Sequence, residues 1–219
     1  MKHTLTPITL LLAAATLIST GCQSTCPSAA KTQTKASQAE ITPARALEQL
    51  VPWLADPSQA GVHHVNIVAG EGPTALLSRR ARLVLRARRE RVPELAPLQG
   101  ATLDVGGFAV HLGHDPVVRE LLPHGTLYAY AVATADDEEL AFLGSIEEEL
   151  KAMHVPCRRI CGRRQLIDAD GERLTGFSLM LDGLSPAGSL RVLESGLGRH
   201  RRLGCGLFVP HKSAAAVRA

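Results

Sequence analysis

The stretch Thr126-Leu-Tyr-Ala-Tyr-Ala-Val-Ala-Thr134 opens the half of the chain whose pattern decides the fold. Its aromatic and β-branched residues are typical of a strand. The elements predicted after it are a helix over 136–153, a hairpin of strands 158–168 and 173–182, a helix that Ser185 caps and that ends near Gly196, and a strand over 204–209. The order β-α-β-β-α-β is the split βαβ pattern, so the sequence predicts an α+β fold with a ferredoxin-like domain.

The loop before the last strand is rich in glycine and arginine. It reads Gly196-Leu-Gly-Arg-His-Arg-Arg-Leu-Gly-Cys-Gly-Leu-Phe-Val209. Its glycines permit positive φ and a close approach of N–H groups to a phosphate, while its arginines are permanently charged, bidentate donors. The aromatic content is 3%, which supplies few rings for base stacking. We therefore expect the loop to bind the backbone of a nucleic acid.

This loop, continued through Pro210-His-Lys-Ser213, resembles the glycine-rich signature of the CRISPR repeat-cleaving endoribonucleases, the sixth Cas family, and closely resembles its MYXAN-subtype branch. The resemblance covers about 46–213, with the family-like elements Val51-Pro-Trp-Leu54, Gly61-Val-His63, Ser78-Arg-Arg-Ala-Arg-Leu-Val-Leu85 and Gly176-Phe-Ser-Leu179. It implies a member of the repeat-associated RNA-processing (RAMP) superfamily, built from tandem ferredoxin-like domains, that cleaves CRISPR repeat RNA to mature guide RNAs.

The first half of the chain predicts the same element order without its first strand. Its elements are a helix over 43–54, strands over 62–68 and 77–87, a weak helix over 91–96 and a strand pair over 101–112. Around the second strand, Arg80, Arg82, Arg86 and Arg88 alternate with alanine and leucine, which predicts one face on the core and one cationic face toward solvent. We expect an incomplete ferredoxin-like domain over 41–120 and a complete one over 121–213.

The N-terminus is typical of an exported protein. Lys2 precedes an apolar run over 8–18 and Ser19-Thr-Gly-Cys22, which predicts a signal with a lipoprotein cleavage box over 1–22, followed by a flexible linker over 23–40. Anchorage through Cys22 at the cell envelope would keep the protein from cytoplasmic RNA. An upstream misplaced start, a recombined or decayed gene, and a genuine lipoprotein are the three explanations.

Metal-free RNA cleavage requires a base for the 2′-hydroxyl, an acid for the leaving 5′-oxygen and cations for the phosphorane, and it yields a 2′,3′-cyclic phosphate. His63, in the Gly-Val-His element, and His200, in the loop, are the catalytic candidates. The alternatives are a strand histidine bonded by backbone for His63, and an RNA contact or a solvated position for His200. No cofactor or metal is expected, because Cys157 and Cys161 lack further ligands at zinc spacing.

The expected RNA-binding residues lie in the loop, on the arginine strand and just after the last strand. They are Gly196, Gly198, Arg199, His200, Arg201, Arg202, Gly204, Gly206, Arg80, Arg82 and Lys212. Arg158, Arg159, Arg163 and Arg164 are expected to hold a duplex stem by its phosphates. For the strand arginines, a solvated face is the alternative.

The expected partner is CRISPR repeat RNA, and the resemblance adds the other subunits of an interference complex. A catalytically impaired RNA-binding remnant is the first alternative, since the first strand is expected to be replaced and the first helix has no histidine. An exported lipoprotein that binds a ligand or partner is the second, and the membrane is a partner only there. We expect a cytoplasmic location for the enzyme.

Overall fold

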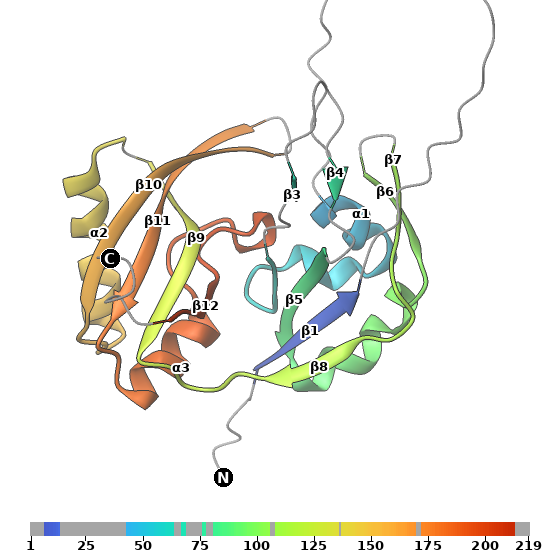
Figure 1. Ribbon diagram of the computed structural model, residues 1–219, viewed down its shortest axis with the longest axis horizontal. Coiled ribbons are helices and arrows are strands. Elements are labelled where there is room, and N and C mark those ends of the chain that lie inside the picture. Colours follow the sequence, from blue (N-terminus) through green and yellow to red (C-terminus); the bar gives the residue numbers. More distant parts are fainter. Residues whose placement is uncertain are drawn as a thin grey trace, which may run out of the picture.

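The computed structural model shows two lobes, each built on a four-stranded antiparallel sheet (Figure 1). It describes residues 7–13, 43–63, 67–68, 76–77, 81–105, 108–135, 137–169 and 172–212, and for 7–13, 67–68, 76–77, 108, 168, 169 and 172 the backbone alone. Among the helices in these residues, none is long and apolar enough to cross a membrane.

The second lobe has the predicted ferredoxin-like order. Its elements are β9 (Thr126–Thr134), α2 (Glu139–Ala152), β10 (Arg158–Ala169), β11 (Glu172–Asp182), α3 (Pro186–Ser195), η3 (Arg201–Leu203) and β12 (Phe208–Pro210). The strands lie in the order β10-β11-β9-β12, as two interleaved βαβ units require. Ser185 caps α3 as expected, since its side-chain oxygen accepts the N–H of Gly188 at 3.1 Å.

The first lobe repeats this topology. Its elements are β1 (Pro7–Ala13), α1 (Pro43–Leu50), η1 (Pro52–Ala55), β2 (Ala60–Val62), β3 (Ile67–Val68), β4 (Leu76–Leu77), β5 (Arg82–Arg88), η2 (Arg89–Leu98), β6 (Thr102–Val105), β7 (Phe108–His111) and β8 (Val117–Glu120). The strand order is β2-β5-β1-β8, which matches the second lobe position for position. The tandem ferredoxin-like prediction is confirmed.

The prediction that this lobe lacks its first strand is wrong. Strand β1 lies between β5 and β8, and it pairs with β5 from Pro7 opposite Arg88 to Ala13 opposite Arg82. Part of the apolar run over 8–18 is therefore the inner strand of a sheet. A short apolar run suits a signal segment and a buried strand equally, so its pattern alone could not separate the two.

The lipoprotein cleavage box at Ser19–Cys22 and the linker lie outside the described residues. Processing before Cys22, or a translation start downstream of Ala13, would remove β1 and leave β5 and β8 without the strand that joins them. The export interpretation and this sheet are thus incompatible in one molecule.

Several predicted elements differ in bounds or type; the helix predicted over 43–54, for example, is α1 followed by the 3-10 helix η1. The predicted strand over 62–68 is interrupted after Val62, and its second part pairs as β3 with β4. The weak helix is the 3-10 helix η2, because Pro93 and Pro97 lack the N–H groups that an α-helix needs. Strand β12 begins at Phe208 and not at residue 204, because Gly204 and Gly206 have positive φ of 84° and 67°.

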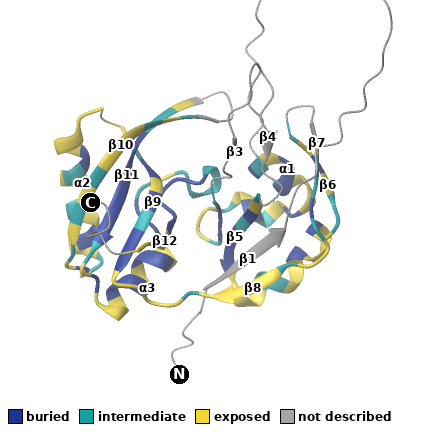
Figure 2. Ribbon diagram, in the orientation of Figure 1, coloured by how far each residue is buried: buried dark blue, intermediate teal, exposed yellow. Residues whose placement is uncertain are grey.

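Each lobe has a hydrophobic core of its own. Leu47, Leu85 and Leu98 are fully buried in the first, whereas Leu127, Leu179 and Phe208 are fully buried in the second. Figure 2 shows buried residues along β9, β11 and α3 in the second lobe and along β5 in the first. The glycine-rich loop runs between the two lobes, so residues from both meet around it (Figure 1).

Candidate functional site

The glycine-rich loop packs directly against strand β2 of the other lobe. A Cβ placed on Gly61 would lie 2.8 Å from Cδ2 of Leu207, so only a glycine permits this approach without a shift of the leucine. Because His63 directly follows Val62, the last residue of β2, the packing brings the family-like Gly-Val-His element beside the loop.

Glycine sets the path of the loop, as predicted. Gly196, Gly198, Gly204 and Gly206 all have positive φ, from 67° to 84°. The loop folds back on itself: the N–H of Leu197 donates to the carbonyl of Gly206 at 3.1 Å, and the N–H of Gly206 donates to Ala131 of β9 at 2.7 Å. These two N–H groups have protein acceptors, so the glycines serve a tight crossing here and leave neither group for a phosphate.

Acidic side chains contact the loop from both lobes. Arg202 forms a bidentate pair with Glu48 of α1, at 2.9 Å from Nε to Oε1 and 3.1 Å from Nη2 to Oε2. The N–H of Gly198 donates to Oε2 of Glu149 in α2 at 2.8 Å. The prediction that Arg202 and Gly198 contact RNA therefore requires that these carboxylates give way. Arg199 is exposed and His200 is half-buried.

Arg86 is not part of a solvated face, contrary to the expectation for its strand. It is 3% exposed, and its two terminal nitrogens donate to the backbone carbonyls of Leu193 at the end of α3 and of Phe208 in β12. The face of β5 that turns away from the first core lies, at this residue, against the second lobe. Sequence alternation placed Arg86 on the correct face but could not show that another lobe covers it.

His63, Arg86 and Arg201 form an electrostatically connected group between the lobes. The backbone N–H of His63 donates to the carbonyl of Val84 at 2.9 Å, while its imidazole Nε2 is buried without a hydrogen-bond partner. Burial, together with the charges of Arg86 and Arg201, lowers the pKa of His63 to about 3, so the ring is neutral at physiological pH. We call these three residues the junction cluster.

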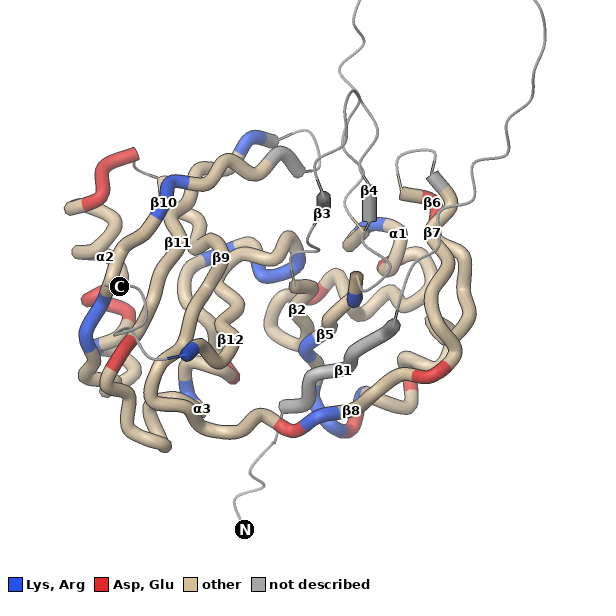
Figure 3. The backbone as a smooth tube through the Cα atoms, viewed as in Figure 1, with Lys and Arg blue, Asp and Glu red and all other residues tan. Residues whose placement is uncertain are grey.

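Both arginines of the junction cluster have one nitrogen without a partner. Nε of Arg86 and Nε of Arg201 are buried and unbonded, although Nη2 of Arg201 donates to the carbonyl of Glu194 at 3.1 Å. Burial, then the charge of Arg201, lowers the pKa of Arg86 to about 9. Arg86 therefore stays cationic at neutral pH. Figure 3 shows basic stretches of β5 and of the loop near the middle of the molecule.

The remaining predicted site residues do not join this cluster. Arg82 and Lys212 are exposed, at the start of β5 and just after β12, whereas Arg80 lies outside the described residues. In the part of the chain that the structure describes, no hydrogen bond or charge interaction links His200 to His63. The structure thus places His63, one of the two catalytic candidates, near Arg201. It also adds Arg86, which was predicted only as part of a basic face of its strand.

Three of the four arginines of β10 are paired with acids of their own lobe. Arg158 contacts Asp182 at 2.5 Å, Arg159 contacts Glu147 at 3.0 Å and Arg164 contacts Asp137 at 2.5 Å. Pairing does not prevent a contact with RNA phosphates, but it lowers the net charge that these arginines present. The predicted grip on a duplex stem remains a prediction.

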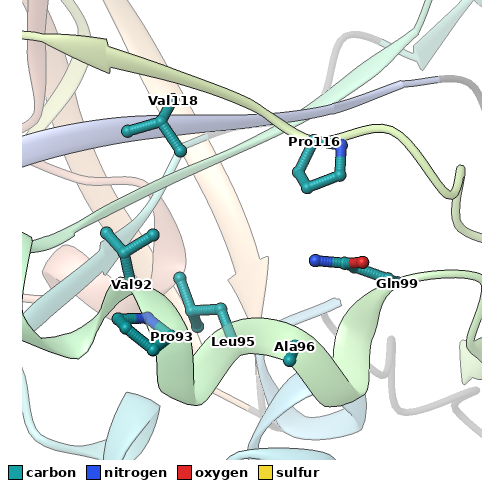
Figure 4. Close-up of a pocket in the computed structure, with 7 residues that line it drawn as sticks. All are labelled: Val92, Pro93, Leu95, Ala96, Gln99, Pro116 and Val118. Carbon is teal, nitrogen blue, oxygen red and sulfur yellow. The ribbon is translucent and has the colours of Figure 1, made fainter.

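An apolar pocket of about 210 Å³ lies away from these charges, between η2 and β8 (Figure 4). It is lined by Val92, Pro93, Leu95, Ala96, Gln99, Pro116 and Val118. Since Gln99 supplies the polar side chain in that lining and no charged residue is present there, the pocket is unsuited to a phosphate.

The paired lobes, with a glycine-rich loop before the last strand and basic residues enclosed between them, define a tandem ferredoxin-like protein of α+β class. The family model described as Cas6 Crispr matches residues 38–213, so the chain belongs to the Cas6 family. The family resemblance of the loop is confirmed.

The chain is 35% identical over 175 residues to the CRISPR-associated endonuclease Cas6 of Myxococcus xanthus strain DK1622. The aligned region covers 80% of this chain and 75% of that protein. Among solved structures, a Cas6-related protein from Pyrococcus furiosus has a TM-score of 0.55 at 12% identity, covering 94% of this chain and 98% of that one. Thermus thermophilus Cse3, bound to an RNA representing a pre-cleavage complex, has a TM-score of 0.50 at 13% identity, with 93% and 98% covered. At these identities, the two structures support the fold.

Proposed function

We propose that this chain is a metal-independent endoribonuclease that cleaves CRISPR repeat RNA into guide RNAs. The observation that carries the proposal is the similarity, over most of both chains, to a Cas6 protein named as an endonuclease. The junction cluster supports it, because an imidazole beside two guanidinium groups is the equipment that phosphodiester cleavage without a metal requires.

The proposed step is an attack of the 2′-oxygen on the adjacent phosphorus with departure of the 5′-oxygen. The products are a 2′,3′-cyclic phosphate and a 5′-hydroxyl. His63 takes the 2′-hydroxyl proton as the base and then gives it to the leaving 5′-oxygen as the acid, while Arg201 and Arg86 offset the charge of the phosphorane. Unoccupied, the imidazole is a weak base, since its pKa is about 3. A phosphate beside it would raise that pKa toward neutrality, where proton transfer is most efficient.

The outward side of the loop would hold the RNA. Arg199 is exposed and His200 is half-buried in the loop, and Arg82 and Lys212 are exposed on neighbouring elements, so all four are proposed contacts to the RNA backbone. Arg202 and the amide of Gly198 would join them after exchanging Glu48 and Glu149 for phosphates. The other subunits of an interference complex are the second proposed partner.

A catalytically impaired RNA-binding protein is the alternative that one observation favours. Nε2 of His63 is buried, and the only other catalytic candidate, His200, lies outside the junction cluster. Helix α1 also carries no histidine that could replace them.

The test is incubation of the full chain with end-labelled repeat RNA in EDTA. We expect one cut per repeat and a 3′ end that resists phosphatase until acid opens the cyclic phosphate. His63→Ala should abolish cleavage but retain binding, whereas His124→Ala, which changes an exposed histidine, should cleave like the wild type. Binding without cleavage by the wild type would support the impaired protein, and absence of both would contradict each RNA function.

A cytoplasmic location follows from the same proposal. Strand β1 supports it, because export with cleavage before Cys22 would remove an inner strand of the first sheet. The intact mass of the protein purified from its own cell fraction tests this point. We expect residues 7–13 to be present in the cytoplasmic fraction, whereas a chain beginning at a lipidated Cys22 would contradict it.

A further inference from the structure

We infer that the junction cluster of His63, Arg86 and Arg201 is a binding site for one phosphate-type oxyanion, enclosed between the two lobes. The inference deepens the proposed function and rests on it for the source of the anion, a backbone phosphate of the RNA. It assigns to Arg86 a direct contact with that phosphate in addition to its contacts across the lobes.

Each residue of the junction cluster has a buried side-chain nitrogen without a hydrogen-bond partner. Within the described residues, four buried side-chain nitrogens have no partner, and three of them are Nε2 of His63, Nε of Arg86 and Nε of Arg201. Buried polar groups in folded proteins are nearly always bonded, because an unbonded one has lost water and gained nothing. A cluster of three at one place is therefore an incomplete set of bonds, which an oxygen-rich ligand can complete.

Among the described residues, no carboxylate is bonded to the two arginines of the junction cluster. The acceptors bonded to Arg86 are the carbonyls of Leu193 and Phe208, and the acceptor bonded to Arg201 is the carbonyl of Glu194. None of these oxygens carries a formal charge. Arg202, the next residue after Arg201, is instead bonded to the carboxylate of Glu48. Within the described residues, Arg202 thus has a counter-ion, whereas Arg86 and Arg201 have none.

The positive charges of Arg86 and Arg201 repel each other and oppose protonation of His63. The charge of Arg201 lowers the pKa of Arg86, and both charges lower the pKa of His63. Two cations in a poorly solvated place oppose each other unless an anion lies between them. An oxyanion removes that repulsion and accepts charge-assisted hydrogen bonds, which are the strong ones.

Entry requires a small movement of the loop. The three nitrogens are shielded from solvent, so the anion reaches them when the loop separates from β2. The packing of Leu207 on Gly61 and the Glu48–Arg202 pair oppose that separation. Substitution of a phosphate for Glu48 on Arg202 would release one of these two restraints.

Titration of the full chain with inorganic phosphate, followed by NMR of the histidine rings at pH 7, tests the site. We expect the His63 ring signals to shift toward those of the protonated form, because a neighbouring anion raises its pKa. Arg201→Met should weaken phosphate binding about tenfold or more, the loss expected for one charge-assisted hydrogen bond. Arg119→Met, which removes an exposed arginine from β8, should bind like the wild type.

Phosphate binding by Arg86→Met is the second measurement, and circular dichroism checks that this variant is folded. If it unfolds, Arg201→Met and His63→Ala decide the question. Unchanged His63 signals at saturating phosphate, or equal losses for Arg201→Met and Arg119→Met, would overturn the site. The RNA cleavage assay separates the two proposals: phosphate at His63 without cleavage removes the enzyme and keeps the site, whereas cleavage by Arg201→Met at the wild-type rate removes the site and keeps the enzyme.

Discussion

Two strands of this molecule carry runs of arginine, and they use them in opposite ways. In β10, Arg158, Arg159 and Arg164 are paired with carboxylates of the same lobe. In β5, Arg86 is buried against the other lobe and is bonded to carbonyls alone. This difference indicates that the number of arginines does not locate an anion-binding site. An arginine that lacks a carboxylate partner is the better indicator of such a site.

The two settings also differ in energy. Exposed ion pairs contribute about 0–1 kcal/mol each, because water screens them and the side chains lose entropy. A buried guanidinium whose acceptors lie across two lobes cannot be removed without leaving those acceptors unbonded. Stability should therefore depend strongly on β5 and weakly on the arginines of β10.

The largest effect is expected for Arg86→Met. It leaves the carbonyls of Leu193 and Phe208 without donors and removes a tie between the lobes, so the free energy of unfolding should fall by about 3 kcal/mol. Urea unfolding measures the loss. Arg82→Met, on the same face of the same strand but exposed, is the control and should change the value by less than about 0.5 kcal/mol. Equal stability of the two variants would contradict the distinction drawn for β5.

The second effect concerns pH. The pKa of His63 is about 3 in the folded chain against 6.5 as its ordinary value, and the charged groups that act on it are Arg86 from β5 and Arg201 from η3. Between these values the unfolded chain binds more protons, so stability is full above pH 6.5 and is lost as pH falls toward 3.

His63→Asn removes this titration. Between pH 7 and pH 5 the wild type should lose about 2 kcal/mol more than the variant, and urea unfolding at both pH values measures the difference. Parallel losses in the two proteins would show that His63 is not the buried, neutral group described here.

A smaller effect is expected at the loop. Glu48→Gln breaks the bidentate pair with Arg202, whose side chain is 31% exposed, so it should lower the unfolding free energy by about 1 kcal/mol. Because one carboxylate beside Arg202 is neutralised, RNA binding should strengthen severalfold at low salt. Filter binding at two salt concentrations checks this, and weaker binding would show that the pair supports the RNA-binding conformation.

The smallest effects are expected in β10. Gln in place of Arg159 or Arg164 should change stability by less than about 0.5 kcal/mol, since the pairs are at the surface. A change as large as that of Arg86→Met would remove the contrast between the strands.

Local sequence patterns predicted the elements of the second lobe correctly. The strand over 126–134, the cap at Ser185 and the positive φ of the loop glycines each depend on neighbours in sequence, and each was confirmed. The failures needed information from far along the chain. Strand β1 pairs with β5, which lies about 75 residues later in the chain. Its short apolar run is equally typical of a signal segment and of a buried strand.

Local sequence was sufficient to predict the Cas6 family, the order of the elements in the second lobe and the glycines where the backbone takes positive φ, because periodicity and glycine act over a few residues. Tertiary structure alone decided that residues 7–13 complete the first sheet. It also decided that Arg86 is enclosed, that Arg202 meets Glu48 and that His63 lies with two arginines. Burial and charge compensation depend on which lobe covers which face, and no local pattern encodes that contact.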